Sequence, residues 1–161
     1  MPTIRRAQPA DAPQLGRLGA LLVETHHAFD ARRFLAPSDE TAARYGSFLA
    51  SQLAEPNAAI LVAEEGGAIV GYAFLTLEGF DYMALRGPAG VLQDIIVTPE
   101  QRGRGIGRRL VAAVLAHLES QHVSQVVLST AVPNVAAQRL FASFGFRRTM
   151  IEMTRELDAT P

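Results

Sequence analysis

An arginine- and glycine-rich turn is the part of the sequence best suited to chemistry. It reads Gln101-Arg102-Gly103-Arg104-Gly105-Ile106-Gly107-Arg108-Arg109. Alternate glycines let backbone N–H groups converge on a ligand, and a helix that begins there points its positive dipole end at the same spot. Arginine adds charge and forked hydrogen bonds. The turn is therefore predicted to hold a diphosphate.

Two common nucleotide-binding loops do not match this spacing. A Walker A loop ends in Gly-Lys-Ser/Thr, whereas two arginines follow Gly107. A dinucleotide fingerprint needs a further small residue where Arg108 or Leu110 stands. A solvated basic helix start is the remaining alternative, but the strand, proline and helix around the turn favour an anion site.

The hydrophobic pattern around the turn predicts the elements that position it. Strands are expected at Thr3–Arg6, Ala59–Glu64, Ala68–Leu77, Val91–Val97, Val126–Leu128 and Phe146–Leu157. Helices are expected from Asp11 past Leu22, from Ser38-Asp39 through Leu53, from Gly105 past Leu118, and from Pro133-Asn134 to Gly145. Gly66-Gly67 suits a tight hairpin turn. Hairpins mixed with βαβ crossovers predict an α/β chain, with a mixed sheet and helices on both faces.

Composition bounds the class of protein. The chain has 161 residues, 48% of them hydrophobic and 19% charged, which fits one folded domain. A net charge of −1 offers no general attraction for nucleic acid or an anionic membrane. The lack of cysteine excludes disulfides and thiolate catalysis, and no metal site is expected. Without a membrane-spanning run or an apolar signal core, we expect a cytoplasmic protein.

Three further segments accompany the turn. Leu92–Pro99 feeds it, Asn134–Phe146 has the form Asn…Ala…Leu-Phe…Gly-Phe, and Ile60–Leu77 forms the expected hairpin. Together with Arg102–Gly107, they resemble the GCN5-related N-acetyltransferase (GNAT) family, whose signature is Gln/Arg-x-x-Gly-x-Gly/Ala at a strand-to-helix turn.

The resemblance implies both a fold and an activity. The fold would be of the α+β GNAT type over residues 1–161, with a mixed, largely antiparallel sheet of six or seven strands and about four helices. The activity would be transfer of an acetyl group from acetyl-CoA, by direct attack, to a primary amine of a small molecule or peptide. The family often forms homodimers, and the apolar region Phe144–Met153 suits that.

The resemblance also implies site residues. The backbone of Ile95, Ile96 and Val97 would pair with the pantetheine arm, and the N–H of Ile96 would polarise the thioester carbonyl. Asn134 would contact the end of that arm, and Phe141 would pack against it. The remaining cofactor contacts would come from Arg102, Gly103, Arg104, Gly105, Ile106, Gly107 and Arg108.

Two positions depart from the family's pattern. Phe141 stands where many members have a tyrosine that protonates the leaving thiolate, and phenylalanine has no proton to donate. Gln93 stands where some members have a glutamate base. Asp94 is the nearest acid, but adjacent strand residues point to opposite faces. Asp94 is therefore either the candidate base or a strand residue that anchors a neighbouring loop.

Acceptor contacts are expected from four positions. His26 and His27 lie near the end of the first helix, Tyr82 lies in the loop before the cofactor strand, and Ser129 ends the strand opposite the slot. Packed or surface roles are the alternative for each. A non-catalytic acetyl-CoA sensor is the alternative function, because Phe141 and Gln93 remove two expected catalytic groups. A nucleotide-phosphate binder of another fold is a third.

Overall fold

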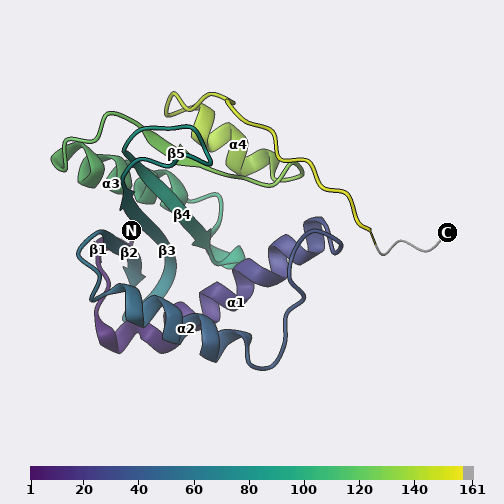
Figure 1. Ribbon diagram of the computed structural model, residues 1–161. Helices are drawn as coiled ribbons and strands as arrows, with labels where there is room; N and C mark the ends of the chain where they lie inside the picture. Colours follow the sequence, from purple (N-terminus) through teal and green to yellow (C-terminus); the bar gives the residue numbers. More distant parts are fainter. Residues whose placement is uncertain (158–161) are drawn as a thin grey trace.

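Five strands form one sheet in the computed structural model, which describes residues 1–157 (Figure 1). Across the sheet they are β1 (Thr3–Arg6), β2 (Ala58–Glu65), β3 (Ala68–Glu78), β4 (Ala89–Val97) and β5 (Val126–Leu128). The first three pairings are antiparallel, and β4 pairs with β5 in parallel. The prediction of a mixed, largely antiparallel sheet is confirmed.

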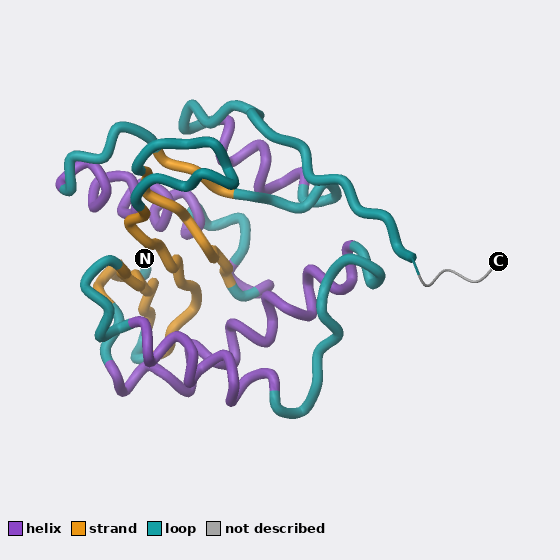
Figure 2. Tube along the Cα trace, viewed as in Figure 1, coloured by secondary structure: helices purple, strands orange, loops and turns teal. Residues whose placement is uncertain are grey.

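Four α-helices cover the two faces of this sheet, as Figure 2 shows. They are α1 (Ala12–Phe29), α2 (Thr41–Gln52), α3 (Ile106–Ser120) and α4 (Val135–Ala142). On one face, α1 and α2 bury Leu15 and Leu49 against Val62 of β2. On the other, α3 buries Leu110 and Val114. The expected two-sided arrangement is confirmed, and each face of the sheet has its own apolar core.

The helices α1 and α2 pack closely because each carries a glycine at their contact. A Cβ atom on Gly16 would lie 2.3 Å from the carbonyl oxygen of Ala42, and one on Gly46 would lie 2.9 Å from that of Ala12. Both distances are shorter than van der Waals contact, so the approach of these helices depends on glycine.

Helix starts differ in detail from the expected caps. Asp11 precedes α1, but its carboxylate accepts the N–H of Gln8 at 2.8 Å and pairs with Arg5 at 2.8 Å instead of capping α1. The helix α2 begins at Thr41, after the predicted Ser38-Asp39 cap. The hairpin turn is confirmed, since Gly66 and its neighbour Gly67 have positive φ angles of 59° and 80°.

A β-bulge interrupts β4 in the middle of the sheet. Phe74 of β3 pairs with Asp94, whereas the next residue, Leu75, pairs with Leu92. Gln93 is therefore an extra residue on β4, and the alternation of side chains is broken there. The bulge changes which side chains of β4 share a face.

The predicted C-terminal strand over Phe146–Leu157 is wrong. Residues 146–157 run from α4 toward the end of α1 without pairing to the sheet (Figure 1), so residues 1–157 contain five strands, not six or seven. The apolar residues Met150, Ile151 and Met153 of residues 146–157 are 82%, 85% and 90% exposed. A strand needs a partner edge, and this segment is instead held by ion pairs to the loop that follows α1.

Those ion pairs join two arginines to two glutamates. Arg33 donates two hydrogen bonds to Glu152, and Arg32 pairs with Glu156 at 3.2 Å. We call residues 146–157 the C-terminal segment. Within residues 1–157, no helix combines the length and the apolar character needed to cross a bilayer.

Candidate active site

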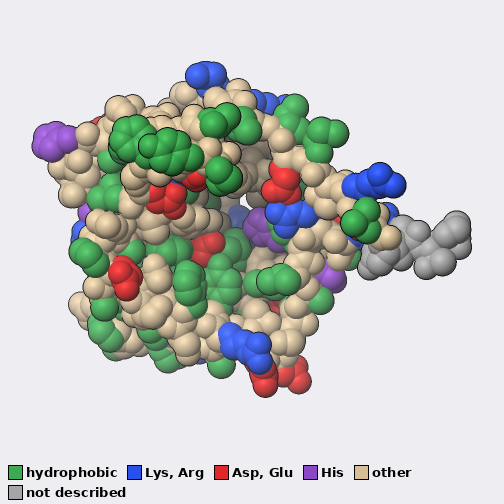
Figure 3. Space-filling model, in the orientation of Figure 1, with side chains coloured by type: hydrophobic (Ala, Val, Ile, Leu, Met, Phe, Trp, Pro, Cys, Tyr) green, Lys and Arg blue, Asp and Glu red, His purple; other side chains and the backbone are tan. Residues whose placement is uncertain are grey.

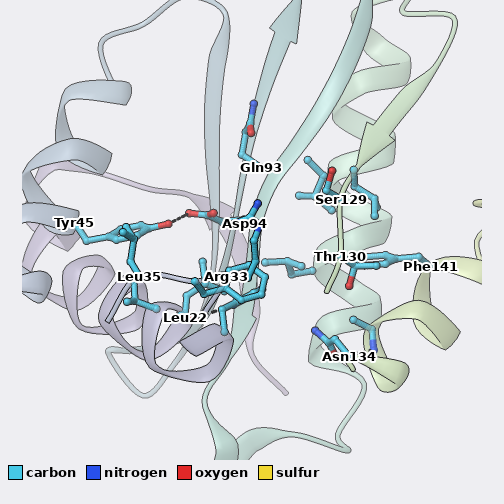
Figure 4. A pocket seen from close by; sticks show the side chains of 17 residues that line it. Leu22, Arg33, Leu35, Tyr45, Gln93, Asp94, Ser129, Thr130, Asn134 and Phe141 are labelled. Atoms are coloured by element: carbon cyan, nitrogen blue, oxygen red, sulfur yellow. Dashed lines mark hydrogen bonds between the residues drawn. The ribbon is translucent and has the colours of Figure 1, made fainter. Parts of the chain in front are cut away.

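A slot opens in the sheet where β4 and β5 separate. The two strands pair only at Gly90–Leu92 with Val126–Leu128. Beyond that point a cavity of about 460 Å³ lies between them, lined by residues of both strands and of α1, α2 and α4 (Figure 4). A short parallel pairing followed by separation gives β4 a free edge inside the molecule.

The free edge of β4 consists of alternate residues. Thr98 donates its N–H to the carbonyl of Val70 at 2.9 Å, and in an antiparallel pair every second residue points the same way. Ile96 therefore also faces β3, while Ile95 and Val97 direct their N–H groups into the slot. The expectation that the Ile96 N–H polarises the thioester is wrong, because that group is turned toward β3.

The Arg/Gly turn presents free backbone donors beyond the end of β4. Gly103 and Gly105 have positive φ angles of 75° and 78°, and a Cβ on either would meet nothing within 4 Å. The helix α3 begins at Ile106. The N–H groups from 103 to 108 form no hydrogen bond within the described part of the chain. Six successive donors at a helix start fit a diphosphate.

The arginine side chains of the turn are largely engaged by the protein. Arg104 donates to both carboxylate oxygens of Glu65 at 3.0 Å, which lowers the pKa of that glutamate. Arg102 donates to the Val97 carbonyl at 3.1 Å, and Arg108 lies 4.9 Å from the centre of the Phe144 ring. Backbone donors, more than guanidinium groups, thus remain available in this turn.

Helix α4 forms the opposite wall of the slot. Asn134 accepts the N–H of Ala137 at 3.2 Å and so caps α4 while lining the cavity. Phe141 also lines the cavity and packs edge-on against Phe146. A Cβ on Gly107 would lie 3.4 Å from the Leu140 side chain, an ordinary van der Waals contact, so the start of α3 lies beside α4.

Asp94 is held by two tyrosines on the floor of the cavity. Its Oδ2 accepts the hydroxyl of Tyr45 at 2.6 Å and that of Tyr72 at 2.9 Å. Burial raises the pKa of the Asp94 carboxyl, although both hydrogen bonds act to lower it. Burial and the carboxylate charge also raise the pKa of both tyrosine hydroxyls, so they remain donors.

The second carboxylate oxygen of Asp94 is open. Oδ1 accepts no hydrogen bond from residues 1–157, yet it is not sealed from solvent. Gln93 lines the same cavity and donates to Thr76 and Glu78 at 3.0 and 3.1 Å. The expectation that Gln93 and Asp94 point to opposite faces is wrong, because the bulge turns both toward the face covered by α1 and α2.

The structure brings some predicted acceptor residues into the cavity and leaves others outside. His26 and Ser129 line it, as does Thr130. His27 does not, and its Nδ1 lies 3.2 Å from the carbonyl oxygen of Phe34. Tyr82 is 78% exposed on the loop between β3 and β4 and also lies outside.

Sequence reasoning missed several cavity residues. Tyr45, which lines the cavity, and the fully buried Tyr72 beneath it gave a usable signal, since a buried tyrosine hydroxyl needs a partner and both donate to Asp94. The loop residues Arg33, Phe34 and Leu35 carry no such pattern, because only the fold brings them to the cavity. No cluster of three potential metal ligands occurs within residues 1–157.

Comparison with known proteins agrees with this geometry. The model of the acetyltransferase (GNAT) family matches residues 22–146. A mycothiol acetyltransferase of Thermobispora bispora is 39% identical over 60% of this chain and 32% of its own length. An aminoglycoside N(6')-acetyltransferase type 1 of Stenotrophomonas maltophilia is 30% identical over 92% of this chain and 88% of its own.

The fold recurs in solved structures. A predicted acetyltransferase of Clostridium acetobutylicum, crystallised with acetyl-CoA, superposes with a TM-score of 0.75 at 17% identity, over 98% of this chain and 97% of that one. The chain spans about a third or less of the length of the mycothiol acetyltransferases that it matches. The family model covers more than half of the sequence, and the chain belongs to the acetyltransferase (GNAT) family.

Proposed function

We propose that the protein is an acetyl-CoA-dependent N-acetyltransferase that acts on a primary amine of a small molecule or peptide. One observation carries the proposal: the open oxygen of Asp94 and the free edge of β4 share a single cavity. A non-catalytic sensor needs the cofactor edge, and it could use Asp94 Oδ2 to bind the two tyrosines, but it needs no open oxygen in the cavity.

The cofactor-binding residues follow from the free donors. The N–H groups of residues 103–108 would hold the pyrophosphate, and the slot-facing backbone of Ile95 and Val97 would pair with the pantetheine arm. Asn134 and Phe141 would contact that arm from α4. Bound there, acetyl-CoA supplies an activated acetyl thioester.

The chemical step requires a free amine. An alkylammonium ion has a pKa of about 10 and must lose a proton before it attacks. The Asp94 carboxylate accepts that proton at Oδ1, and its raised pKa makes it a better base than an exposed aspartate. A carbon–nitrogen bond forms, the carbon–sulfur bond breaks, and the thiolate leaves. The attacking nitrogen gives up its second proton to water, and because Phe141 donates no proton, the thiolate takes one from water.

Several finer assignments belong to the same proposal. One relative is named an aminoglycoside N(6')-acetyltransferase, and this name supports a small-molecule amine as the acceptor here. We place the protein in the cytoplasm and treat residues 1–161 as one domain. The exposed apolar residues of the C-terminal segment support a homodimer.

Release of coenzyme A in the presence of an amine panel tests the proposal. Free thiol is measured with each amine, and the product is identified by mass. We expect at least one primary amine to gain a single acetyl group. Tight acetyl-CoA binding without transfer to any amine would instead establish the sensor.

A substitution in the turn tests the cofactor assignment. Gly105→Glu places negative charge and bulk among the free N–H groups, and we expect loss of CoA binding by calorimetry. Gly66→Glu is the matched control, because Gly66 has a similar positive φ and open surroundings but lies in the β2–β3 turn. Equal affinities for CoA in the two variants would refute the assignment.

A further inference from the structure

The acceptor end of the cavity has apolar walls. Leu22 and Val23 come from α1, and Phe34 and Leu35 come from the loop that follows it (Figure 4 labels Leu22 and Leu35). His26 adds an aromatic ring that packs edge-on against Phe34, 5.1 Å between centroids. Figure 3 shows the hollow on this face, bordered by hydrophobic side chains and also by basic, acidic and histidine side chains. The walls suit a hydrocarbon body.

Charged groups in the cavity are few and balanced. Among the 17 lining residues, Asp94 is the single carboxylate and Arg33 the single arginine. Arg33 is fixed by two hydrogen bonds to Glu152 and lies 4.9 Å from the centre of the Phe34 ring. One anionic group, Asp94, thus faces the acceptor, and the charge of Arg33 is balanced by Glu152 outside the lining.

The acids beside the cavity are held in ion pairs with arginines, and Arg86 is shared between Glu78 and Asp81. Glu78, which contacts Gln93, pairs with Arg86 at 2.6 Å. Glu156 of the C-terminal segment pairs with Arg32 at 3.2 Å. The mouth therefore offers no concentration of negative charge to a second or third ammonium group.

Resting on the proposed function, we propose that the acceptor is a primary amine with one positive charge carried on an apolar body, and that polyamines are rejected. Asp94 Oδ1 satisfies one ammonium ion. A second ammonium on the same molecule would lose its hydration against Leu22 and Phe34, with no unpaired carboxylate in the lining to receive it. Burial of an unpaired charge is strongly unfavourable.

Hexylamine and 1,6-diaminohexane test this, because they differ only in a second ammonium group. Their dissociation constants for the CoA-bound protein are measured by calorimetry, alongside kcat/KM for coenzyme release. We expect hexylamine to bind about tenfold more tightly per amino group. Equal or tighter binding of the diamine, or binding of neither, would overturn the proposal.

A substitution at the rim of the cavity tests whether the lack of a second anion causes the rejection of diamines. Leu35 is 81% exposed, so it tolerates replacement without loss of the fold. Leu35→Glu supplies an anion for the second ammonium and should reduce the preference for hexylamine over 1,6-diaminohexane severalfold. The uncharged Leu35→Gln should preserve that preference. An unchanged preference in Leu35→Glu would overturn the charge argument. A retained binding preference with no turnover would overturn only the proposed transferase activity.

Discussion

At the scale of single residues, the two carboxylate oxygens of Asp94 have different surroundings. One oxygen ties α2 and β3 together through Tyr45 and Tyr72, and the other faces the cavity. The sequence left open an anchor for a neighbouring loop or a base; the structure shows contacts to α2 and β3 instead of a loop, and the base stays a proposal. Burial of the ionised Asp94 carboxyl lowers the stability of the fold, whereas the same ionised group is the form that can accept a proton. Removal of the charge should therefore change stability and activity in opposite directions.

Replacement of Asp94 separates these effects. Asp94→Asn keeps an oxygen for the tyrosines but removes the base, and we expect turnover to fall about 10²- to 10⁴-fold at neutral pH. CoA affinity should not change, since the carboxyl lies apart from the turn. Unchanged turnover would show that Asp94 serves only as an anchor.

The same variant should be more stable than the native protein at neutral pH. Because burial raises the folded-state pKa of Asp94, the folded protein binds this proton more tightly than the unfolded chain does. Stability therefore falls as pH rises from the unfolded to the folded pKa. At pH values above the folded-state pKa of Asp94, the thermal midpoint of Asp94→Asn should be higher than that of the native protein. The difference should shrink as the pH is lowered toward the unfolded-state pKa.

At the scale of elements, two local features set the geometry of the site. The bulge at Gln93 turns Asp94 toward α1 and α2, and the Gly16–Gly46 contact lets these helices pack closely beneath it. Tyr45 of α2 reaches Asp94 across this packed layer. The position of the carboxyl group thus depends on the spacing of the helices.

Gly16→Ala tests that spacing. Alanine is intrinsically better than glycine in a helix by about 1 kcal/mol, but a Cβ would lie 2.3 Å from the Ala42 carbonyl oxygen. We expect the steric effect to dominate and cost about 1–3 kcal/mol, measured by denaturant unfolding. Gly79→Ala, where a Cβ meets nothing within 4 Å, should have little effect. A stabilised Gly16→Ala would contradict the close contact.

The sequence predicted those helices and strands whose ends or pairing are marked by nearby residues, such as turn glycines and alternating apolar positions. The β2–β3 hairpin follows from alternation and Gly66-Gly67, and the start of α3 from Gly105. The bulge was not predicted, because an extra strand residue has no compositional mark. The predicted strand at 146–157 failed because apolar residues alone do not supply a partner edge.

At the scale of the whole molecule, the loop after α1 lines the cavity and is joined by ion pairs to the C-terminal segment. Arg33 lines the cavity and binds Glu152 of that segment. Residues far apart in sequence thus meet at the acceptor end, which is why no sequence window predicted them. The attachment depends on exposed ion pairs, and such pairs contribute little to global stability.

Glu152→Gln should release the segment without unfolding the protein. We expect an unchanged thermal midpoint but severalfold faster trypsin cleavage after Arg155. Glu119→Gln is the control, because Glu119 is an exposed acid on α3 that forms no ion pair within residues 1–157. Equal cleavage rates in the two variants would show that the ion pair does not hold the segment.

The separation of β4 from β5 has a consequence for hydrogen exchange. Amides in the middle of a sheet usually exchange slowly, but those of Ile95 and Val97 face the slot, whereas Ile96 is bonded to β3. We expect fast exchange at 95 and 97 and slow exchange at 96 by NMR, with coenzyme A slowing only the first two. Slow exchange at all three in the free protein would contradict the open edge. This alternation makes the backbone itself a reporter of cofactor occupancy, independent of any acceptor.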